Sequence, residues 1–202
     1  MKNIVKAIMI CVAFSTVACN NDDNNNETVE QNLVFENNNA IVIPDATGGW
    51  LDPNVPAIIS SAISVDAKGR IVKPWKVNIS LELNYFHASY TDFELFAPSG
   101  ESCKLINQLY CRYIAGNIVT FNSGAISPIQ QYSFPVATGS YLPSTGLQNV
   151  QADNLGAFLE GKDIDGVWTL KITDRVNDEI DTDPNDEKLV SWKLEFDRDA
   201  LE

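Results

Sequence analysis

Apolar and polar residues alternate in several short stretches of this 202-residue chain. In the clearest stretch the apolar positions are Val77, Ile79, Leu81, Leu83 and Tyr85, with polar residues between them. Alternation of this kind turns one face of an extended strand toward a core and the other toward water. Two later stretches, 168–172 and 192–196, begin with tryptophan and repeat the pattern. We therefore expect half-buried β-strands, with Trp168 and Trp192 in the core.

Stretches rich in β-branched and aromatic residues recur between turn-forming clusters, with lengths and spacing that suit antiparallel strands. They run over Leu33–Phe35, Ile41–Ile43, Ala57–Val65, Ile71–Tyr85, Phe93–Phe96, Ile118–Phe121, Val167–Thr173 and Val190–Phe196. Helical evidence is confined to Leu155–Glu160, where Gly156 and Gly161 leave room for a turn or two. Many short strands with almost no helix predict an all-β fold, a jelly-roll β-sandwich that forms a single domain over residues 32–202.

The N-terminal segment has the order of a secretory leader. Lys2 and Lys6 precede an apolar run, from Ala7 to Phe14, that is too short to span a bilayer, and small residues follow up to position 18. Residues 1–18 are therefore interpreted as a signal peptide.

Cys19 directly follows Ala18, which resembles the lipobox of bacterial lipoproteins, whose cysteine is acylated and becomes the new N-terminus. The resemblance implies a lipoprotein signal peptide and lipidation at Cys19. Ordinary cleavage that leaves a free Cys19 is the alternative, because Thr16 stands where leucine is usual.

Residues 19–31 read CNNDDNNNETVEQ, which has almost nothing to bury and no periodicity. Such a composition predicts a disordered acidic tether. Asp22 with Asp23 resembles the acidic signal that sends lipoproteins of some bacteria to the outer face of the outer membrane. The expected localisation is the cell envelope, lipid-anchored at the outer membrane and exposed at the surface.

The formal charge of the chain is −13, from 14 basic and 27 acidic residues. The leader holds two lysines and no acid, so the 14 basic residues less two, against 27 acidic, leave −15 after cleavage. Nucleic acids and anionic lipid headgroups need a basic face, so we expect no nucleic-acid partner and membrane contact through the lipid anchor only. Cations remain suitable ligands.

Two cysteines remain outside the leader and the lipidation site, Cys103 and Cys111. An exported protein folds in a compartment that permits oxidation, and the residues between the two suggest short facing segments. We expect a Cys103–Cys111 disulfide that closes a short loop and contributes about 2 to 3 kcal/mol. Two buried free thiols are the alternative.

Several segments, taken in order, resemble one known family. They are IVIPDATGG from Ile41, VNISLELNYFHASYTDFELFAPSGESCKLI from Val77, TGSYLPSTGLQNV from Thr138, GKDIDGVWTLKITD from Gly161 and LVSWKLEF from Leu189. The matching positions are His87, Asp92, Pro98, Ser99, Gly100, Gly139, Tyr141, Pro143, Gly166, Trp168, Asp174 and Trp192. Together the segments resemble the P domain, or P/Homo B domain, which follows the catalytic domain of proprotein convertases and many bacterial proteases. The acidic loop VNDEIDTDPNDEK and the cysteine pair depart from the pattern.

The resemblance implies a jelly-roll β-sandwich of the galactose-binding-like kind, in the context of serine endopeptidases and proteolysis. It does not imply catalysis, because the protease residues of the family lie in a separate domain. The residues agree, since His87 is the one histidine and no nucleophile motif accompanies it. We interpret His87 as structural and expect no enzyme, although a glycosidase needs only a pair of carboxylates and stays open.

Two groups of acids could hold calcium, which takes oxygen ligands gathered from loops. The first group is Asp163 and Asp165 with Asp45 or Asp52 from the opening loop, if the fold brings that loop to the start of a late strand. The second is Asp181, Asp183, Asp186 and Glu187. In the second group Pro184 and the missing glycine depart from an EF-type loop, so a solvated acidic hairpin is the favoured interpretation.

The expected function is that of a non-catalytic P-domain-like binding or stabilising module on an exported lipoprotein, associated with extracellular proteolysis. The alternative is a carbohydrate-binding or adhesion protein of the cell surface. Exposed aromatic residues would then stack on sugar rings, and the candidates are Trp50, Trp75, Tyr132 and Tyr141. The identity of the protein or glycan partner is left open.

Overall fold

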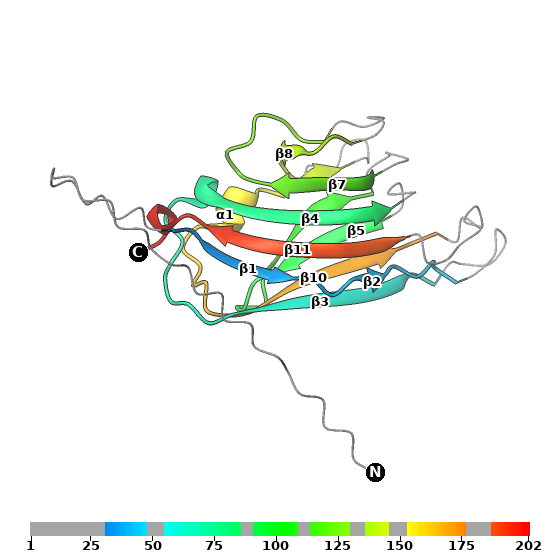
Figure 1. Cartoon of the computed structure of the whole chain (residues 1–202), viewed down its shortest axis with the longest axis horizontal. Helices are drawn as coiled ribbons and strands as arrows, with labels where there is room; N and C mark the ends of the chain where they lie inside the picture. The colour runs from blue at the N-terminus through cyan, green and yellow to red at the C-terminus, as the bar shows by residue number, and fades with distance from the viewer. Residues whose placement is uncertain are drawn as a thin grey trace, which may run out of the picture.

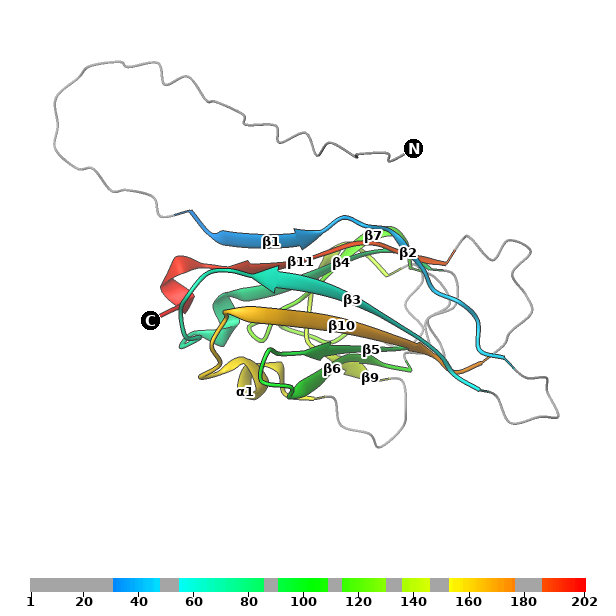
Figure 2. The ribbon, with the colours of Figure 1, turned by 90° about the horizontal axis from the view of Figure 1, so that it is seen from below.

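The computed structural model describes residues 31–47, 55–85, 91–108, 114–129, 136–145, 153–176 and 187–202. The predicted leader and nearly all of the tether lie outside these residues. The described chain folds into two β-sheets packed face to face, with one short α-helix at one end (Figure 1, Figure 2). The predicted all-β sandwich is confirmed.

The first sheet has the order β1-β11-β4-β7-β8, and β2 also pairs with β11. Its strands are β1 (Leu33–Asn37), β2 (Ile41–Val42), β4 (Val77–Tyr85), β7 (Ile114–Phe121), β8 (Gly139–Tyr141) and β11 (Lys188–Phe196). The second sheet has the order β3-β10-β5-β6-β9. Its strands are β3 (Ala57–Val65), β5 (Thr91–Phe96), β6 (Ser102–Asn107), β9 (Ser144–Thr145) and β10 (Gly166–Asp174).

The chain crosses repeatedly between the two sheets, so strands that are neighbours in sequence often lie in different layers. The helix α1 (Leu155–Leu159) and the 3-10 turns η1 (Pro74–Lys76) and η3 (Arg198–Ala200) gather where β10 starts. We call this the helix end of the sandwich. The loop end is the opposite one, where β10 ends, β5 begins and β11 begins (Figure 1).

The core lies between the sheets and is formed by the inward-facing residues of both. The indoles of Trp168 and Trp192 are at most 1% exposed, as the alternation predicted. Each indole N–H has an acceptor: Trp168 donates to the Ile164 carbonyl at 2.9 Å, and Trp192 donates to the Ser61 hydroxyl at 2.9 Å. The second of these bonds joins the two sheets, because Trp192 lies on β11 and Ser61 on β3.

The predicted strands and the observed ones differ in several places: β7 begins at Ile114 and not at Ile118, and the short strands β8 and β9 were not predicted. The stretch predicted from Ile71 forms a strand only from Val77, because Pro74 starts the 3-10 turn η1 and interrupts the extended backbone. The strand β6 was missed because its alternation is broken. A bulge opposite Phe93 and Glu94 adds Leu105, so that Leu105 and Ile106 are both buried.

Gly166 should be the most sensitive glycine at the helix end, because its φ is +118° and an added Cβ would lie 2.8 Å from the Pro98 Cβ. We expect Gly166→Ala to lower the free energy of unfolding by about 2–4 kcal/mol, from backbone strain and overpacking together. The matched control is Gly100→Ala, where φ is also positive but nothing lies within 4 Å, so about 1 kcal/mol is expected. Urea unfolding measures both, and equal losses would contradict the steric argument.

Candidate functional site

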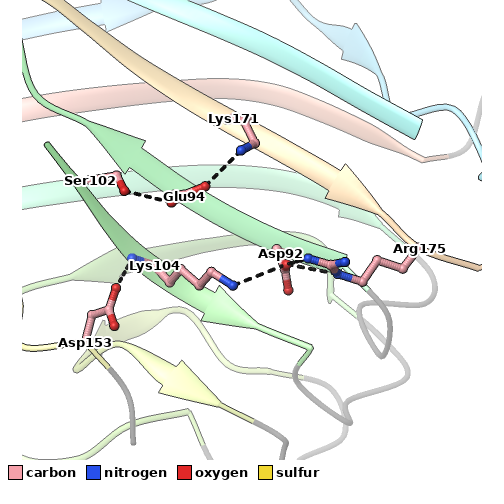
Figure 3. Close-up of polar contacts among 7 residues, drawn as sticks. All are labelled: Asp92, Glu94, Ser102, Lys104, Asp153, Lys171 and Arg175. Atoms are coloured by element: carbon pink, nitrogen blue, oxygen red, sulfur yellow. Dashed lines mark hydrogen bonds and ion pairs between the residues drawn. The ribbon is translucent and has the colours of Figure 1, made fainter. Parts of the chain in front are cut away.

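A network of ion pairs covers the outer face of the second sheet (Figure 3). Glu94 on β5 lies between two neighbouring strands: Lys171 on β10 approaches one carboxylate oxygen at 3.0 Å, and Ser102 on β6 donates to the other at 2.7 Å. The ammonium of Lys171 also lies 5.3 Å from the Phe96 ring centroid. These cross-strand contacts connect the strands β10, β5 and β6 side by side.

Asp92 occupies the loop end of the same network. Its Oδ2 accepts hydrogen bonds from Arg175 Nε at 3.0 Å and Nη2 at 2.5 Å, and Lys104 Nζ lies 3.6 Å away. The Asp92 side chain is only 5% exposed, whereas those of Arg175 and Lys104 remain 40% and 35% exposed. Two half-exposed cations therefore neutralise one buried carboxylate, and they fasten β5 to β6 and to the residue that follows β10.

The electrostatics of Glu94 fit a structural role. Burial by itself raises the pKa of this carboxyl, but the hydrogen bonds from Ser102 and Lys171 and the charges of Lys171 and Lys104 outweigh it, so that the net pKa lies below the ordinary value. A carboxyl with a depressed pKa stays ionised at neutral pH, and its stabilising contribution is lost only as pH falls through that lowered pKa. Such a group is unsuited to act as a general acid at neutral pH.

A cluster of three carboxylates lies at the loop end. Asp174 ends β10 in the second sheet, Glu187 immediately precedes β11 in the first sheet, and Asp45 follows β2. One oxygen of each lies within 4.8 Å of one oxygen of the others. Asp174 and Glu187 are buried, and Asp45 is half-buried. Asp174 also accepts a hydrogen bond from the Val176 amide at 2.9 Å, which turns the chain at the end of β10.

The structure does not bring Asp45 to the other described acids of the first predicted calcium group. Asp45 lies against Asp174 at the loop end, whereas Asp163 and Asp165 precede β10 at the helix end. The nine residues of β10 separate the two positions by roughly 26 Å at the usual rise per residue, too far for one ion. Sequence reasoning paired these acids from opposite ends of a strand. Asp52 and, from the second group, Asp181, Asp183 and Asp186 lie outside the described residues.

Asp163 and Asp165 are both exposed and line a polar cleft of about 540 Å³ at the helix end. The cleft is shared with the turn between β5 and β6, where Glu101 forms an ion pair with Lys162. The Lys162 ammonium also lies 5.0 Å from the Phe158 ring centroid. The Asp163 backbone forms a bridge with Arg70, which holds this segment next to the connection between β3 and η1.

Cys103 is a free thiol in the structure, so the predicted Cys103–Cys111 disulfide is not supported. Its position on β6 faces inward, and the residue is 1% exposed among the apolar side chains of the core. Burial, followed by the charges of Asp153 and Glu94, raises the pKa of the Cys103 thiol to about 12. Cys111 lies outside the described residues. The physical reason for the difference is that the strand alternation turns Cys103 into the sandwich, a direction that residue spacing alone did not reveal.

The aromatic candidates for sugar stacking differ in their exposure. Trp75 in η1 is 55% exposed. Tyr141 is half-buried against the core, and its hydroxyl donates to the Ala137 carbonyl at 2.8 Å. Trp50 and Tyr132 lie outside the described residues. Of the described candidates, Trp75 is thus the one that presents its ring to solvent.

His87 also lies outside the described residues, as does Cys19. In the part of the chain that the structure describes, no helix is long and apolar enough to cross a membrane. Sequence reasoning missed the pairing of Asp174 with Glu187, although both were visible. The signal was that Asp174 ends one predicted strand and Glu187 lies just before the next one, because the end of a strand and the start of the following antiparallel strand lie at the same end of a sandwich.

No protein-family model matches this sequence, and no curated protein matches it. Among solved structures, the crystal structure of a serine protease of Aeromonas sobria is similar, with a TM-score of 0.30 and 16% sequence identity. The match covers 81% of this chain and 27% of the protease chain. This chain therefore spans about a quarter of that protein, and a likeness of this size carries no argument about activity.

Alkylation with iodoacetamide at pH 8 tests the state of Cys103. We expect the folded protein to leave Cys103 unmodified, because burial both shields the thiol and keeps it protonated. The same reaction in denaturant without reductant should modify Cys103 and Cys111, as measured by mass spectrometry of the tryptic peptides. Resistance of both thiols in denaturant, reversed by reductant, would show a disulfide and contradict the free thiol.

Proposed function

We propose that this domain is a non-catalytic binding or stabilising module that resembles the P domain and is carried by an exported, lipid-anchored protein associated with extracellular proteolysis. The observation that carries the proposal is the ion-pair network of the second sheet (Figure 3). Its acids lie between cations of neighbouring strands, an arrangement that cross-links a scaffold, and the lowered pKa of Glu94 makes this carboxyl unsuited to proton donation at neutral pH.

The sequence resemblance supports the same reading. One aspartate of the family pattern, Asp92, takes part in the network, and the pattern residues Trp168 and Trp192 fill the core. Gly166 and Pro98, two further pattern residues, pack against each other at the helix end. These five pattern residues thus serve the architecture of the sandwich, which is what a resemblance in fold without catalysis implies.

Calcium at the loop end is part of the proposal. Oxygen ligands at 2.3–2.6 Å from one calcium ion lie at most about 5 Å from each other, and the carboxylates of Asp45, Asp174 and Glu187 meet this limit with 4.8 Å. An ion there would join residues of both sheets. It would stabilise the end of the sandwich at which β10 ends and β11 begins.

Carbohydrate binding at the cell surface is the second candidate, and the exposure of Trp75 favours it. The Trp75 carbonyl accepts a hydrogen bond from Asn122 at 3.0 Å, which holds the turn in place while the indole remains 55% exposed. An aromatic face presented on a rigid turn can stack on a sugar ring. A glycan array with Trp75→Ala as the control distinguishes this function from protein binding.

A peptidase assay tests whether the module is catalytic. We expect the purified full-length protein to cleave a mixed fluorogenic peptide library no faster than its His87→Ala variant, because His87 is the only histidine available as a base. The initial rate of fluorescence increase is the measurement. Cleavage by the wild type that disappears in His87→Ala would overturn the proposal.

Thermal unfolding tests the calcium site. We expect millimolar calcium, relative to chelator, to raise the melting temperature of the wild type by several degrees, because an ion that binds only the folded state stabilises it. Glu187→Gln should lose most of this increase. Asp163→Asn is the matched control, since this acid lies at the helix end, and it should keep the increase. A wild-type melting temperature that is the same in calcium and in chelator would remove the ion from the proposal.

A further inference from the structure

The strand β3 forms an unusual sheet edge. Of the strands that end the two described sheets, β8 has three residues, β9 has two, and β1 has five and carries Glu36. β3 has nine residues, AIISSAISV, without a charge, a proline or a glycine. Proteins commonly protect sheet edges with short strands, charges or proline, because an open edge offers unpaired backbone groups to another chain. β3 has none of these protections.

The hydrogen bonds beside β5 show which way its backbone groups point. The Thr91 carbonyl accepts from the Gln108 amide at 3.3 Å, on the side of β6. The Ala97 amide, just beyond the strand, donates to the Glu101 carbonyl at 2.9 Å on the same side. Because directions alternate along a strand, the odd-numbered residues of β5 face β6, and the even-numbered ones face β10.

The same alternation continues to β3. The register sets Lys171 opposite Glu94, whose backbone groups point toward β10, so the backbone groups of the odd-numbered residues of β10 point toward β5. Those of the even-numbered residues of β10 therefore point toward β3. They lie opposite odd-numbered residues of β3, such as Ser61 opposite Leu170. The backbone groups that point away from the sheet therefore belong to Ile58, Ser60, Ala62 and Ser64. The Asn37 side-chain amide confirms this direction, because it donates to the outward Ala62 carbonyl at 2.9 Å.

In the described part of the chain, that bond from Asn37 is the only protein hydrogen bond to the outward backbone groups of these four residues. Their side chains are exposed as well, with Ile58 at 59% and three small residues after it. A groove of about 440 Å³ runs between β1 and β3, and Glu36 is the one charged residue that lines it. In Figure 2 the β3 ribbon lies between those of β1 and β10.

We propose that the β3 edge binds an extended peptide segment of a partner protein, which adds to the second sheet as a further strand and places a basic side chain against Glu36. This inference rests on the proposed binding function and names its surface and the kind of partner. Backbone hydrogen bonds to Ile58, Ser60 and Ser64 supply affinity, and the small outward side chains admit a closely packed strand.

Charge decides between a separate partner and a second copy of this chain. Two copies would each bring a formal charge of −13 and would repel each other. A basic segment is attracted by the same charge and finds a carboxylate in the groove at Glu36. The occupant is therefore a basic extended peptide.

The probe for the test is a fluorescent, end-capped nine-residue peptide that alternates valine and threonine around one lysine, titrated into the full-length protein in detergent. We expect saturable binding by fluorescence anisotropy. Ser60→Pro removes an outward N–H without removing a bond to β10, and binding should weaken about tenfold, as for one lost hydrogen bond. The matched variant Ser60→Thr keeps the N–H and should bind within about twofold of the wild type.

Three controls keep the result decisive. A peptide with N-methyl groups at alternate positions, which cannot form the ladder, should not bind, and this control does not depend on the folding of any variant. Exchanging the peptide lysine for glutamate should weaken binding several-fold in the wild type and less in Glu36→Gln. Hydrogen exchange should show new protection at Ile58, Ser60 and Ser64. Equal binding of the N-methylated peptide, or of a folded Ser60→Pro variant, would overturn the inference.

Sedimentation and partner capture separate the remaining outcomes. A concentration-dependent dimer that Ser60→Pro abolishes would assign the edge to a second copy and overturn the proposed occupant. If the protein and its Ser60→Pro variant retain the same cross-linked envelope partner, the β3 inference fails while the binding function stands. Peptide cleavage that depends on His87 would instead overturn the proposed function itself.

Discussion

The structure depends on closing two sheets over an apolar core that contains two indoles. Trp168 and Trp192 are almost wholly buried, and a buried indole N–H without an acceptor would cost about 1–3 kcal/mol. Both are satisfied, Trp168 within the approach to β10 and Trp192 across the core by the Ser61 hydroxyl. Ser61 also accepts from the Asn37 amide at 3.1 Å, so one hydroxyl on β3 receives hydrogen bonds from two strands of the opposite sheet. The position of β3 against the first sheet follows from these bonds.

Because the two sheets close over an apolar core, the charged side chains lie at the ends of the sandwich and on the outer face of the second sheet. Buried acids at the ends of strands, such as Asp174, lie close to acids of the other sheet. Acids on the outer face, such as Glu94, form ion pairs with lysines on neighbouring strands. The same closure leaves β3 at the margin of the second sheet, held from within by Ser61, and among the described residues only Asn37 bonds to its outward backbone groups. The closed core therefore leaves the charged side chains at the edges, the ends and the outer face of the sandwich.

The alternation of residues was enough to predict much of the fold. It placed β3 with its observed bounds, and it identified Trp168 and Trp192 as core residues because burial follows a period of two in a strand that is covered on one face. It failed where local geometry departs from that period. Pro74 shortened the stretch before β4, and the bulge at Leu105 hid β6.

The candidate sites were less accessible to sequence reasoning, because they depend on which strand ends meet in space. Asp45 was recognised as a candidate ligand, but its neighbours are Asp174 and Glu187 and not Asp163, since the direction of β10 separates these acids by its whole length. Cys103 was paired with Cys111 from spacing, whereas the pleat of β6 turns its thiol into the core.

The sequence by itself determined the class of fold, the faces of the long strands and the excess of negative charge, because these properties are local or additive. Only the tertiary structure decided which acids gather at the loop end, that the Cys103 thiol lies buried, and that β3 ends a sheet with its outer backbone groups open. Each of these depends on the order and direction in which strands far apart in the chain pair. Long-range pairing of that kind leaves no periodic signal in any single segment.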